Sequence, residues 1–190
     1  METYGVSQLS ADVFGALSLL TPYDIDVPKI RVGAPRDGGY VMAQLGSGGN
    51  LLSFGIANDV RFEMEMAIKG RRCFMYDHTI DDLPHRHDKF IFFKKGICGD
   101  GHRTDDLLSL GECLGSLPCS ERLLLKMDVE GAEWDVFSTA SDEVLSRFDQ
   151  IVGEFHWLLE LENERFRTKF CEAMTRLNKH FTLFHVHANN

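Results

Sequence analysis

The side chains best suited to chemistry begin in a dense acidic turn. The apolar run 123–127 is followed by Asp128, Glu130 and Glu133, with Gly131 where the backbone must bend. Three consecutive leucines in that run suit a strand that is buried on both faces. Open α/β sheets bind their ligands just beyond the carboxyl ends of such strands. We therefore expect Asp128 at a strand tip where chemistry is done, whereas Glu133 serves the first turn of the next helix.

A second reactive group lies downstream, in the stretch 150–157, which predicts a strand. Glu154 and His156 are two residues apart, so both side chains leave the same face of that strand. Three interpretations are open. His156 is a general base held in its tautomer by a nearby carboxylate; or Asp128, Glu154 and His156 bind a divalent cation such as Mg²⁺ or Mn²⁺; or Glu154 and His156 form a polar pair without a catalytic role.

A cofactor-binding corner is predicted around Gly55 and Asp77. The run 51–54 predicts the first core strand, and Gly55 follows it, with Asp59 placed to cap the next helix. Asp77 follows the second strand, 73–76, and lies 22 positions after Gly55. An acidic residue about that far beyond the glycine turn typically bonds ribose hydroxyls. The alternative is a helix cap or a solvated turn carboxylate. An NAD site is disfavoured because the Gly-x-Gly-x-x-Gly pattern is missing.

Strands and helices alternate along the chain, which predicts an α/β fold with a doubly wound, mostly parallel sheet. Later strands are expected at 90–93, 123–127, 150–157 and 182–187, the last with His185 and His187 on one face, and helices at 59–69, 105–110 after a Thr104 cap, 131–138 and 160–179. A helical pattern within residues 1–22 stops at Pro22. It predicts either a packing element beside the sheet or a lid over the cofactor.

The acidic stretch also carries a family resemblance. Lys126 to Trp134, Lys-Met-Asp-Val-Glu-Gly-Ala-Glu-Trp, resembles the Lys-hydrophobic-Asp-hydrophobic-Glu-Gly segment of FkbM-type methyltransferases, class I enzymes that use S-adenosylmethionine (SAM). Three further segments agree in order: Asp37-Gly-Gly-Tyr40, Ser53 to Asp59, and Glu154-Phe-His156. The resemblance implies one domain over 1–190, with a helical segment at 1–30 and a Rossmann-like core at 31–190. It also implies the strand order 3-2-1-4-5 with strand 6 beyond, while the last antiparallel strand of that fold is expected to be lacking.

The resemblance further implies where SAM binds. Its site would comprise Asp37, Gly38, Gly39, Tyr40, Gly55, Asp59, Asp77, Asp100 and Asp128, with Asp100 in a loop that borders the adenine. From the residues alone, Asp-Gly-Gly at 37–39 predicts a hairpin turn. The alternative is that the two glycines let backbone amides approach a ligand closely. Both interpretations stay open at this stage.

Methyl transfer to a small-molecule or sugar hydroxyl is the activity that the resemblance implies. Such a transfer aligns nucleophile, methyl group and sulfur, and it needs a base or a metal to help remove the hydroxyl proton. On this view Asp128, Glu154 and His156 are the catalytic group, with His156 or a bound Mg²⁺ or Mn²⁺ assisting. Two alternatives remain: a metal-dependent hydrolase of α/β fold, which needs no ribose partner at Asp77, and an inactive SAM-binding or nucleoside-binding module.

Composition narrows the classes of partner. The net charge is −9 and no basic stripe is evident, which disfavours nucleic acid. No run of 18 apolar residues occurs, so no membrane span is expected. Five cysteines, at 73, 98, 113, 119 and 171, form no Cys-x-x-Cys pair, which predicts free thiols, a reducing compartment and a cytoplasmic location. The sequence does not indicate an oligomeric state.

Overall fold

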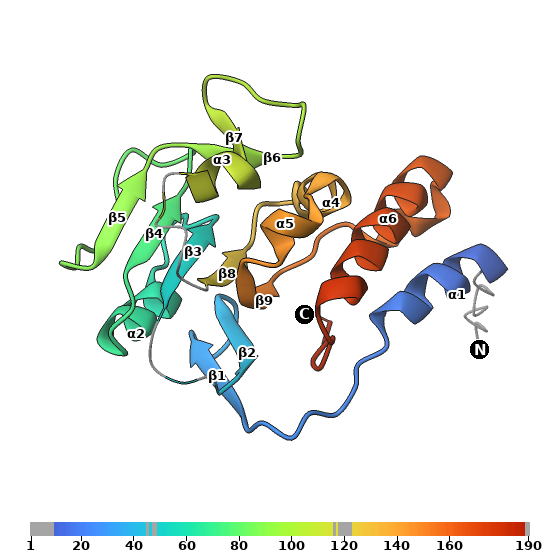
Figure 1. Ribbon diagram of the computed structural model, residues 1–190, viewed down its shortest axis with the longest axis horizontal. Coiled ribbons are helices and arrows are strands. Elements are labelled where there is room, and N and C mark those ends of the chain that lie inside the picture. Colours follow the sequence, from blue (N-terminus) through green and yellow to red (C-terminus); the bar gives the residue numbers. More distant parts are fainter. Residues whose placement is uncertain (1–9, 45, 47–48, 116, 118–122, 189–190) are drawn as a thin grey trace, which may run out of the picture.

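Five parallel strands form the central sheet of the computed structural model, which describes residues 10–44, 46, 49–115, 117 and 123–188. The strand order is β5-β4-β3-β8-β9 (Figure 1). The strands are β3 Asn50–Phe54, β4 Cys73–Tyr76, β5 Phe90–Phe93, β8 Leu123–Met127 and β9 Phe148–Gly153. All four neighbouring pairs are parallel. The predicted α/β, doubly wound architecture and the order 3-2-1-4-5 are therefore confirmed.

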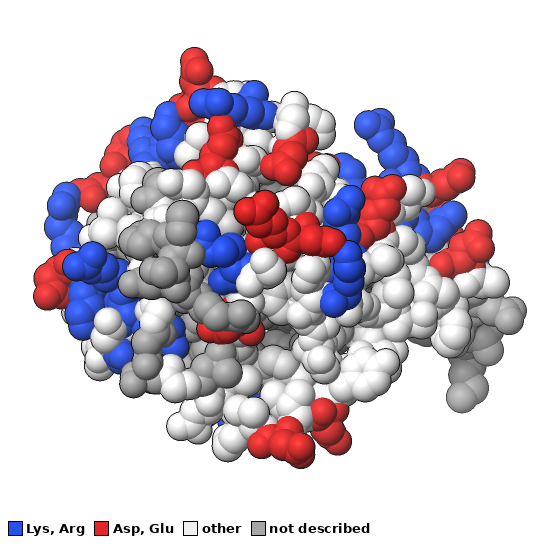
Figure 2. All heavy atoms as spheres, viewed as in Figure 1, with Lys and Arg blue, Asp and Glu red and all other residues white. Residues whose placement is uncertain are grey.

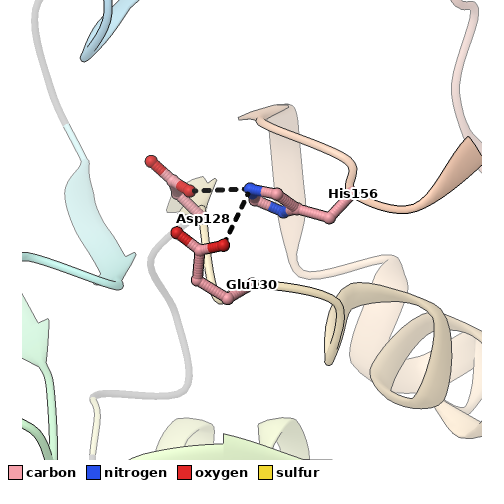
Figure 3. A group of neighbouring side chains, drawn as sticks. All are labelled: Asp128, Glu130 and His156. Atoms are coloured by element: carbon pink, nitrogen blue, oxygen red, sulfur yellow. Dashed lines mark ion pairs between the residues drawn. The ribbon is translucent and has the colours of Figure 1, made fainter.

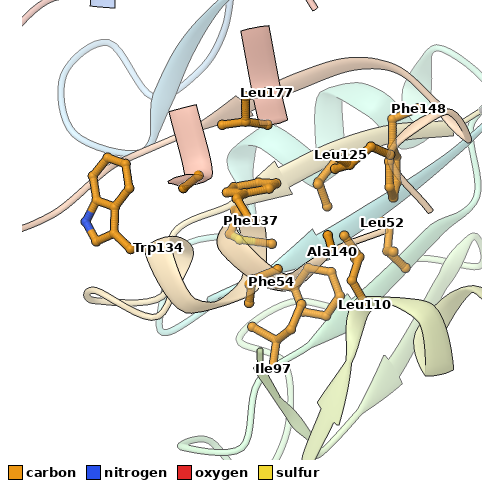
Figure 4. Packing of buried hydrophobic residues seen from close by; sticks show 14 of the residues in the cluster. Leu52, Phe54, Ile97, Leu110, Leu125, Trp134, Phe137, Ala140, Phe148 and Leu177 are labelled. Atoms are coloured by element: carbon orange, nitrogen blue, oxygen red, sulfur yellow. The ribbon is translucent and has the colours of Figure 1, made fainter. Parts of the chain in front are cut away.

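Helices cover one face of this sheet. They are α1 Ala11–Leu17, α3 Leu110–Gly115, α4 Glu133–Thr139, α5 Asp142–Leu145 and α6 Glu164–His180, with the short 3-10 helices η1 Ser18–Leu20 and η2 Leu158–Glu162. Alternate strand residues such as Leu52, Phe54 and Leu125 point into this layer, where they meet Trp134 and Phe137 of α4 (Figure 4). The residues between them in sequence point to the opposite face, as the two-residue period of a strand requires.

A hairpin and one helix cover the second face. The hairpin consists of β1 Lys29–Gly33 and β2 Gly39–Ala43, which pair antiparallel, and the helix is α2 Arg61–Ile68. Gly38 has φ +74°, and a Cβ at Gly39 would lie 1.9 Å from the carbonyl oxygen of Ala34. The predicted hairpin turn at 37–39 is therefore found, and it explains these two glycines through the turn itself.

The hairpin is tied to the sheet by a side chain. Gln150 of β9 accepts the N–H of Ala43 at 2.6 Å and donates to the carbonyl of Ala43 at 3.3 Å. The amide of this glutamine thus takes the place of a neighbouring strand's backbone. The hairpin holds Tyr40 against the carboxyl end of β8, which matters for the site described below.

Two predicted elements are wrong, and a third ends earlier than expected. Residues 181–188 form no strand; they run beside the N-terminal segment, where Tyr23 N–H donates to Leu183 O and Lys29 Nζ donates to Phe184 O. The strand expected at 150–157 is β9 Phe148–Gly153, so Glu154 and His156 lie beyond its end and do not share a strand face. The helix expected at 105–110 is instead the short strand β7 Leu107–Ser109, which pairs with β6 Gly96–Cys98 before α3 begins.

The N-terminal helix is a packing element. Val13 and Ala16 of α1 are buried in the core cluster that includes α6. Among the described residues, no helix is long and apolar enough to cross a membrane. Cys73, Cys98, Cys113 and Cys171 form no disulfide, and Cys119 lies outside the described residues.

Candidate active site

The site lies where the direction of the strand order reverses. The chain runs outward from β3 through β4 to β5, and then returns to place β8 on the other side of β3. The carboxyl ends of β3 and β8 lie in register, Phe54 beside Met127. Asp128 N–H donates to Phe54 O at 3.1 Å. Open α/β sheets bind their ligands at such a switch point, beyond the carboxyl ends of the strands.

Gly55 is required where β3 meets the loop of β8. It has φ +78°, and a Cβ built there would lie 1.6 Å from the carbonyl oxygen of Asp128. Its N–H donates to Tyr76 O at 3.1 Å, and its carbonyl accepts a hydrogen bond from Lys126 Nζ. The glycine therefore permits close packing of the two strand ends, which places Asp128 directly against the glycine turn.

Asp77 organises the same loop. Its Oδ2 accepts the N–H groups of Ile56 and Ala57 at 2.8 Å, and its Oδ1 accepts the N–H and hydroxyl of Thr79 at 2.8 and 2.6 Å. Burial alone would raise the pKa of this carboxyl, but these donors outweigh burial and lower it. A ribose hydroxyl could reach Asp77 only by replacing one of these four donors, of which the Thr79 hydroxyl is the one side chain.

Asp128 is oriented by two buried groups from below. The Tyr40 hydroxyl donates to Asp128 Oδ2 at 2.8 Å, and Lys126 Nζ lies 3.9 Å from the same oxygen. Burial first, and then the charge and hydrogen bond of Asp128, raise the pKa of Tyr40, so the phenol stays a donor. Oδ1 of Asp128 is thereby left to face His156, at 3.8 Å from Nε2.

Glu133 holds the other side of the imidazole. Its Oε1 lies 3.0 Å from His156 Nδ1, and its carboxylate also accepts the N–H groups of Val129 and Gly131 at 2.9 Å. Glu133 is fully buried. Trp134 Nε1 donates to the carbonyl of His156 at 2.8 Å. A carboxylate on Nδ1 fixes the tautomer and leaves Nε2 free to act, the arrangement that also orients histidines toward metals.

Three side chains that could bind a cation lie close together around His156 Nε2. Glu130 Oε2 lies 3.5 Å from His156 Nε2, and suitable atoms of Asp128, Glu130 and His156 all lie within 4.8 Å of one another (Figure 3). Two ligands at about 2.1 Å from one ion are separated by at most about 4.2 Å. The distances of 3.8 and 3.5 Å from His156 Nε2 to the Asp128 and Glu130 oxygens fall within this limit. Glu154 Oε1 is also 3.8 Å from Nε2, although it is not part of this three-residue group.

The acidic surroundings govern the charge of the imidazole. Partial burial alone would lower the pKa of His156, but the hydrogen bond and charge of Glu133, followed by the charges of Glu130 and Asp128, raise it above its usual value. Either a base or a metal ligand needs Nε2 unprotonated. The same carboxylates that could hold a cation therefore compete with it for a proton.

The remaining predicted residues form two sets. Asp37 and Asp59 lie at the hairpin turn, whereas Asp100, His185 and His187 lie elsewhere. Asp59 lies beside the hairpin turn, since a Cβ at Gly38 would be 3.0 Å from its Oδ2, and it also accepts the N–H of Arg61, the first residue of α2. Asp37 accepts the N–H of Gly38 at 2.9 Å. Asp100 is exposed, after β6. His185 and His187 pair with each other at 3.1 Å near Lys29, and no interaction in the described part of the chain joins them to His156.

Sequence reasoning missed Glu130 and the structural part played by Glu133. Glu130 has φ +55°, and this left-handed conformation turns its side chain back over the strand tip. An acidic residue directly before a glycine, after a buried strand, was the available signal. Glu133 was expected only at a helix start, yet its burial makes it the carboxylate that orients His156.

Comparisons with family models, with curated proteins and with solved structures found no match. The site is therefore interpreted from its own geometry and chemistry.

Replacing Tyr40 by phenylalanine should weaken both fold and site. The change leaves Asp128 Oδ2 without its buried donor, so we expect the free energy of unfolding to fall by about 1–2 kcal/mol. Urea denaturation measures this loss, and Tyr23→Phe, at a side chain that is 65% exposed, is the matched control. Equal stabilities for the two variants would show that the Tyr40 hydrogen bond does not orient Asp128.

Proposed function

We propose that this chain is a SAM-dependent methyltransferase that acts on a hydroxyl of a small molecule or sugar. One observation supports the proposal above the others. The glycine turn after β3, the carboxylate of Asp77 and the Asp128–His156 pair share one edge of a parallel sheet, at its switch point. Nucleoside cofactors bind at such edges, with acidic residues toward the ribose.

Charge at this edge suits the cofactor. SAM carries a positive sulfonium, and carboxylates of Asp59, Asp77, Asp128 and Glu130 surround the strand ends. Lys and Arg are interspersed with acidic side chains on the face that Figure 2 draws, without a continuous basic stripe there. A cationic cofactor with a neutral acceptor agrees with this balance better than a polyanion does.

The transfer itself is a displacement at carbon. The acceptor oxygen attacks the methyl carbon, the bond from methyl carbon to sulfur breaks, and sulfur keeps the electron pair to become the neutral thioether of S-adenosylhomocysteine. The hydroxyl proton passes to Nε2 of His156, whose Nδ1–H is held by Glu133. Asp128, 3.8 Å from Nε2, stabilises the imidazolium that forms.

A divalent cation is the alternative route to the same deprotonation. Asp128, Glu130 and His156 would hold it, and a mixed carboxylate and imidazole set favours Mn²⁺ over Mg²⁺. A bound cation would lower the pKa of the acceptor hydroxyl. The same three residues also support a second candidate function, metal-dependent hydrolysis. A hydrolase of this kind would not bind SAM. Activity that survives exhaustive chelation would favour the base.

Binding of S-adenosylhomocysteine tests the proposal directly. At 100 times its Kd, a ligand specific for the folded state should stabilise the protein by about 2.7 kcal/mol. Thermal unfolding with and without the nucleoside measures this, with adenosine and NAD as controls. A melting temperature unmoved by S-adenosylhomocysteine, together with no heat in calorimetry, would reject the methyltransferase and leave the hydrolase.

A further inference from the structure

An exposed tryptophan stands immediately beside the site. Trp157 follows His156 and is 60% exposed, whereas Trp134 is 1% exposed. Large aromatic side chains usually bury most of their surface, so an exposed indole next to reactive groups calls for an explanation. Leu159, two residues on, is 96% exposed.

The indole is held in place from one side. Three of its ring carbons lie 3.1–3.2 Å from the position that a Cβ would take at Gly131, so one part of the ring rests on that glycine. The backbone of Trp157 has φ +64°. Hydrogen bonds fix the chain on both sides of it: Trp134 Nε1 donates to the carbonyl of His156, and Glu160 N–H donates to the carbonyl of Trp157. A left-handed tryptophan is costly and persists where the surroundings impose it.

The groups near this ring define what it would take. Glu130, whose side chain is 85% exposed, belongs to the same loop as Gly131, and with Asp128 and Glu154 it surrounds His156 Nε2. An ionised carboxylate accepts hydrogen bonds but cannot donate them, so the ligand must bring donors. They also repel anions. A positively charged acceptor would meet the sulfonium of the cofactor, so a neutral molecule with several hydroxyls is favoured.

We propose that Trp157 is a stacking platform for the acceptor, a neutral polyhydroxylated ring whose apolar face lies on the indole while its hydroxyls reach the carboxylates. This inference rests on the proposed function and deepens it. The ring positions the acceptor and takes no part in proton transfer, so Trp157 is a positioning residue. Its loss should affect acceptor binding far more than cofactor binding.

Ligand-observed NMR with saturation transfer tests the platform, using methyl α-glucopyranoside, methyl β-galactopyranoside and methyl α-fucopyranoside on the protein with S-adenosylhomocysteine. We expect at least one glycoside to bind, with a Kd raised about tenfold in Trp157→Ala and less in Trp157→Phe, which keeps an aromatic face. Phe14→Ala, at a side chain that is 70% exposed on α1, is the control and should leave the Kd unchanged.

Three outcomes would overturn the platform. They are no glycoside binding, equal binding by wild type and Trp157→Ala, and binding only of catechol or choline, tested as the planar and cationic probes. Calorimetry with S-adenosylhomocysteine separates the two proposals. If the wild type binds S-adenosylhomocysteine but shows no glycoside binding that depends on Trp157, the platform alone is rejected. If the wild type does not bind S-adenosylhomocysteine, the methyltransferase is rejected.

Discussion

His156→Ala should lower the rate of methyl transfer by roughly 10²–10⁴-fold, the range that removal of a positioned acid or base gives. The reason is that the single ring nitrogen facing Asp128 and Glu130 would be lost. Affinity for S-adenosylhomocysteine should stay close to that of the wild type, because no cofactor contact is assigned to the imidazole. The measurement is release of S-adenosylhomocysteine with an acceptor on which the wild type turns over. His85→Ala, at an exposed histidine in the loop before β5, is the control.

The pH dependence of the wild type tests the same role of His156 as the base. Because the acidic neighbours raise the pKa of His156, activity should rise with pH through a value above its usual 6.5. The linked stabilisation has the opposite course: it is fully present below about 6.5 and is lost as pH rises through the raised value. NMR titration of the imidazole measures the pKa without any acceptor.

Undiminished turnover in His156→Ala would remove this residue from both the base and the metal scheme.

Gly55→Ala should destabilise the fold by roughly 4 kcal/mol or more, an effect that single substitutions reach only by severe clashes or lost networks. The new Cβ would lie 1.6 Å from the carbonyl oxygen of Asp128, which is backbone and cannot rotate away. Either β3 or the loop after β8 must move, and movement of that loop displaces Asp128. We therefore expect loss of nucleoside binding as well as a lower midpoint in urea.

Gly70→Ala separates strain from collision. Gly70 has φ +98°, also in the left-handed half of backbone space, but no atom lies within 4 Å of a Cβ there. Its substitution should cost only about 1–2 kcal/mol, the ordinary penalty for an L-residue in that conformation. If both alanine variants lost the same stability, close approach of Gly55 to Asp128 would not be what fixes the site.

The sheet could be predicted because each of its strands carries a strong local signal. Runs such as 51–54 and 123–127 are apolar except for Ser53 and Lys126, as expected of strands that are buried on both faces. The strand expected at 182–187 had only alternation to support it, and tertiary contacts with residues 21–29 prevailed. The helix start was misplaced because Ser109 and Glu112 form a capping box that decides where α3 begins.

The site was harder to predict because its geometry depends on turns. Asp128 was identified from its place after an expected strand and His156 from its place within one, and Asp128 Oδ1 lies 3.8 Å from His156 Nε2. Glu130 enters through its left-handed backbone, and Glu133 through burial, neither of which spacing alone reveals. Asp77 shows the converse: its position after the second strand was predicted, but its bonds to the Gly55 loop came only from the fold.

The hairpin β1–β2 is a distinct part of the structure beside the candidate site. It forms a two-stranded sheet of its own, so it can part from the molecule without breaking any rung of the five-stranded ladder. Parting would break the two Gln150 bonds, the Tyr40–Asp128 bond, the bond from Gly33 N–H to Glu65 of α2 and the bond from Lys29 Nζ to Phe184 O. It would also remove the apolar contacts with α2. Local opening of this kind is governed by its own free energy, below that of global unfolding. Opening of the fifteen residues 29–43 would take Tyr40 away from Asp128, so one of the two groups that orient this carboxylate comes from a segment remote from it in sequence.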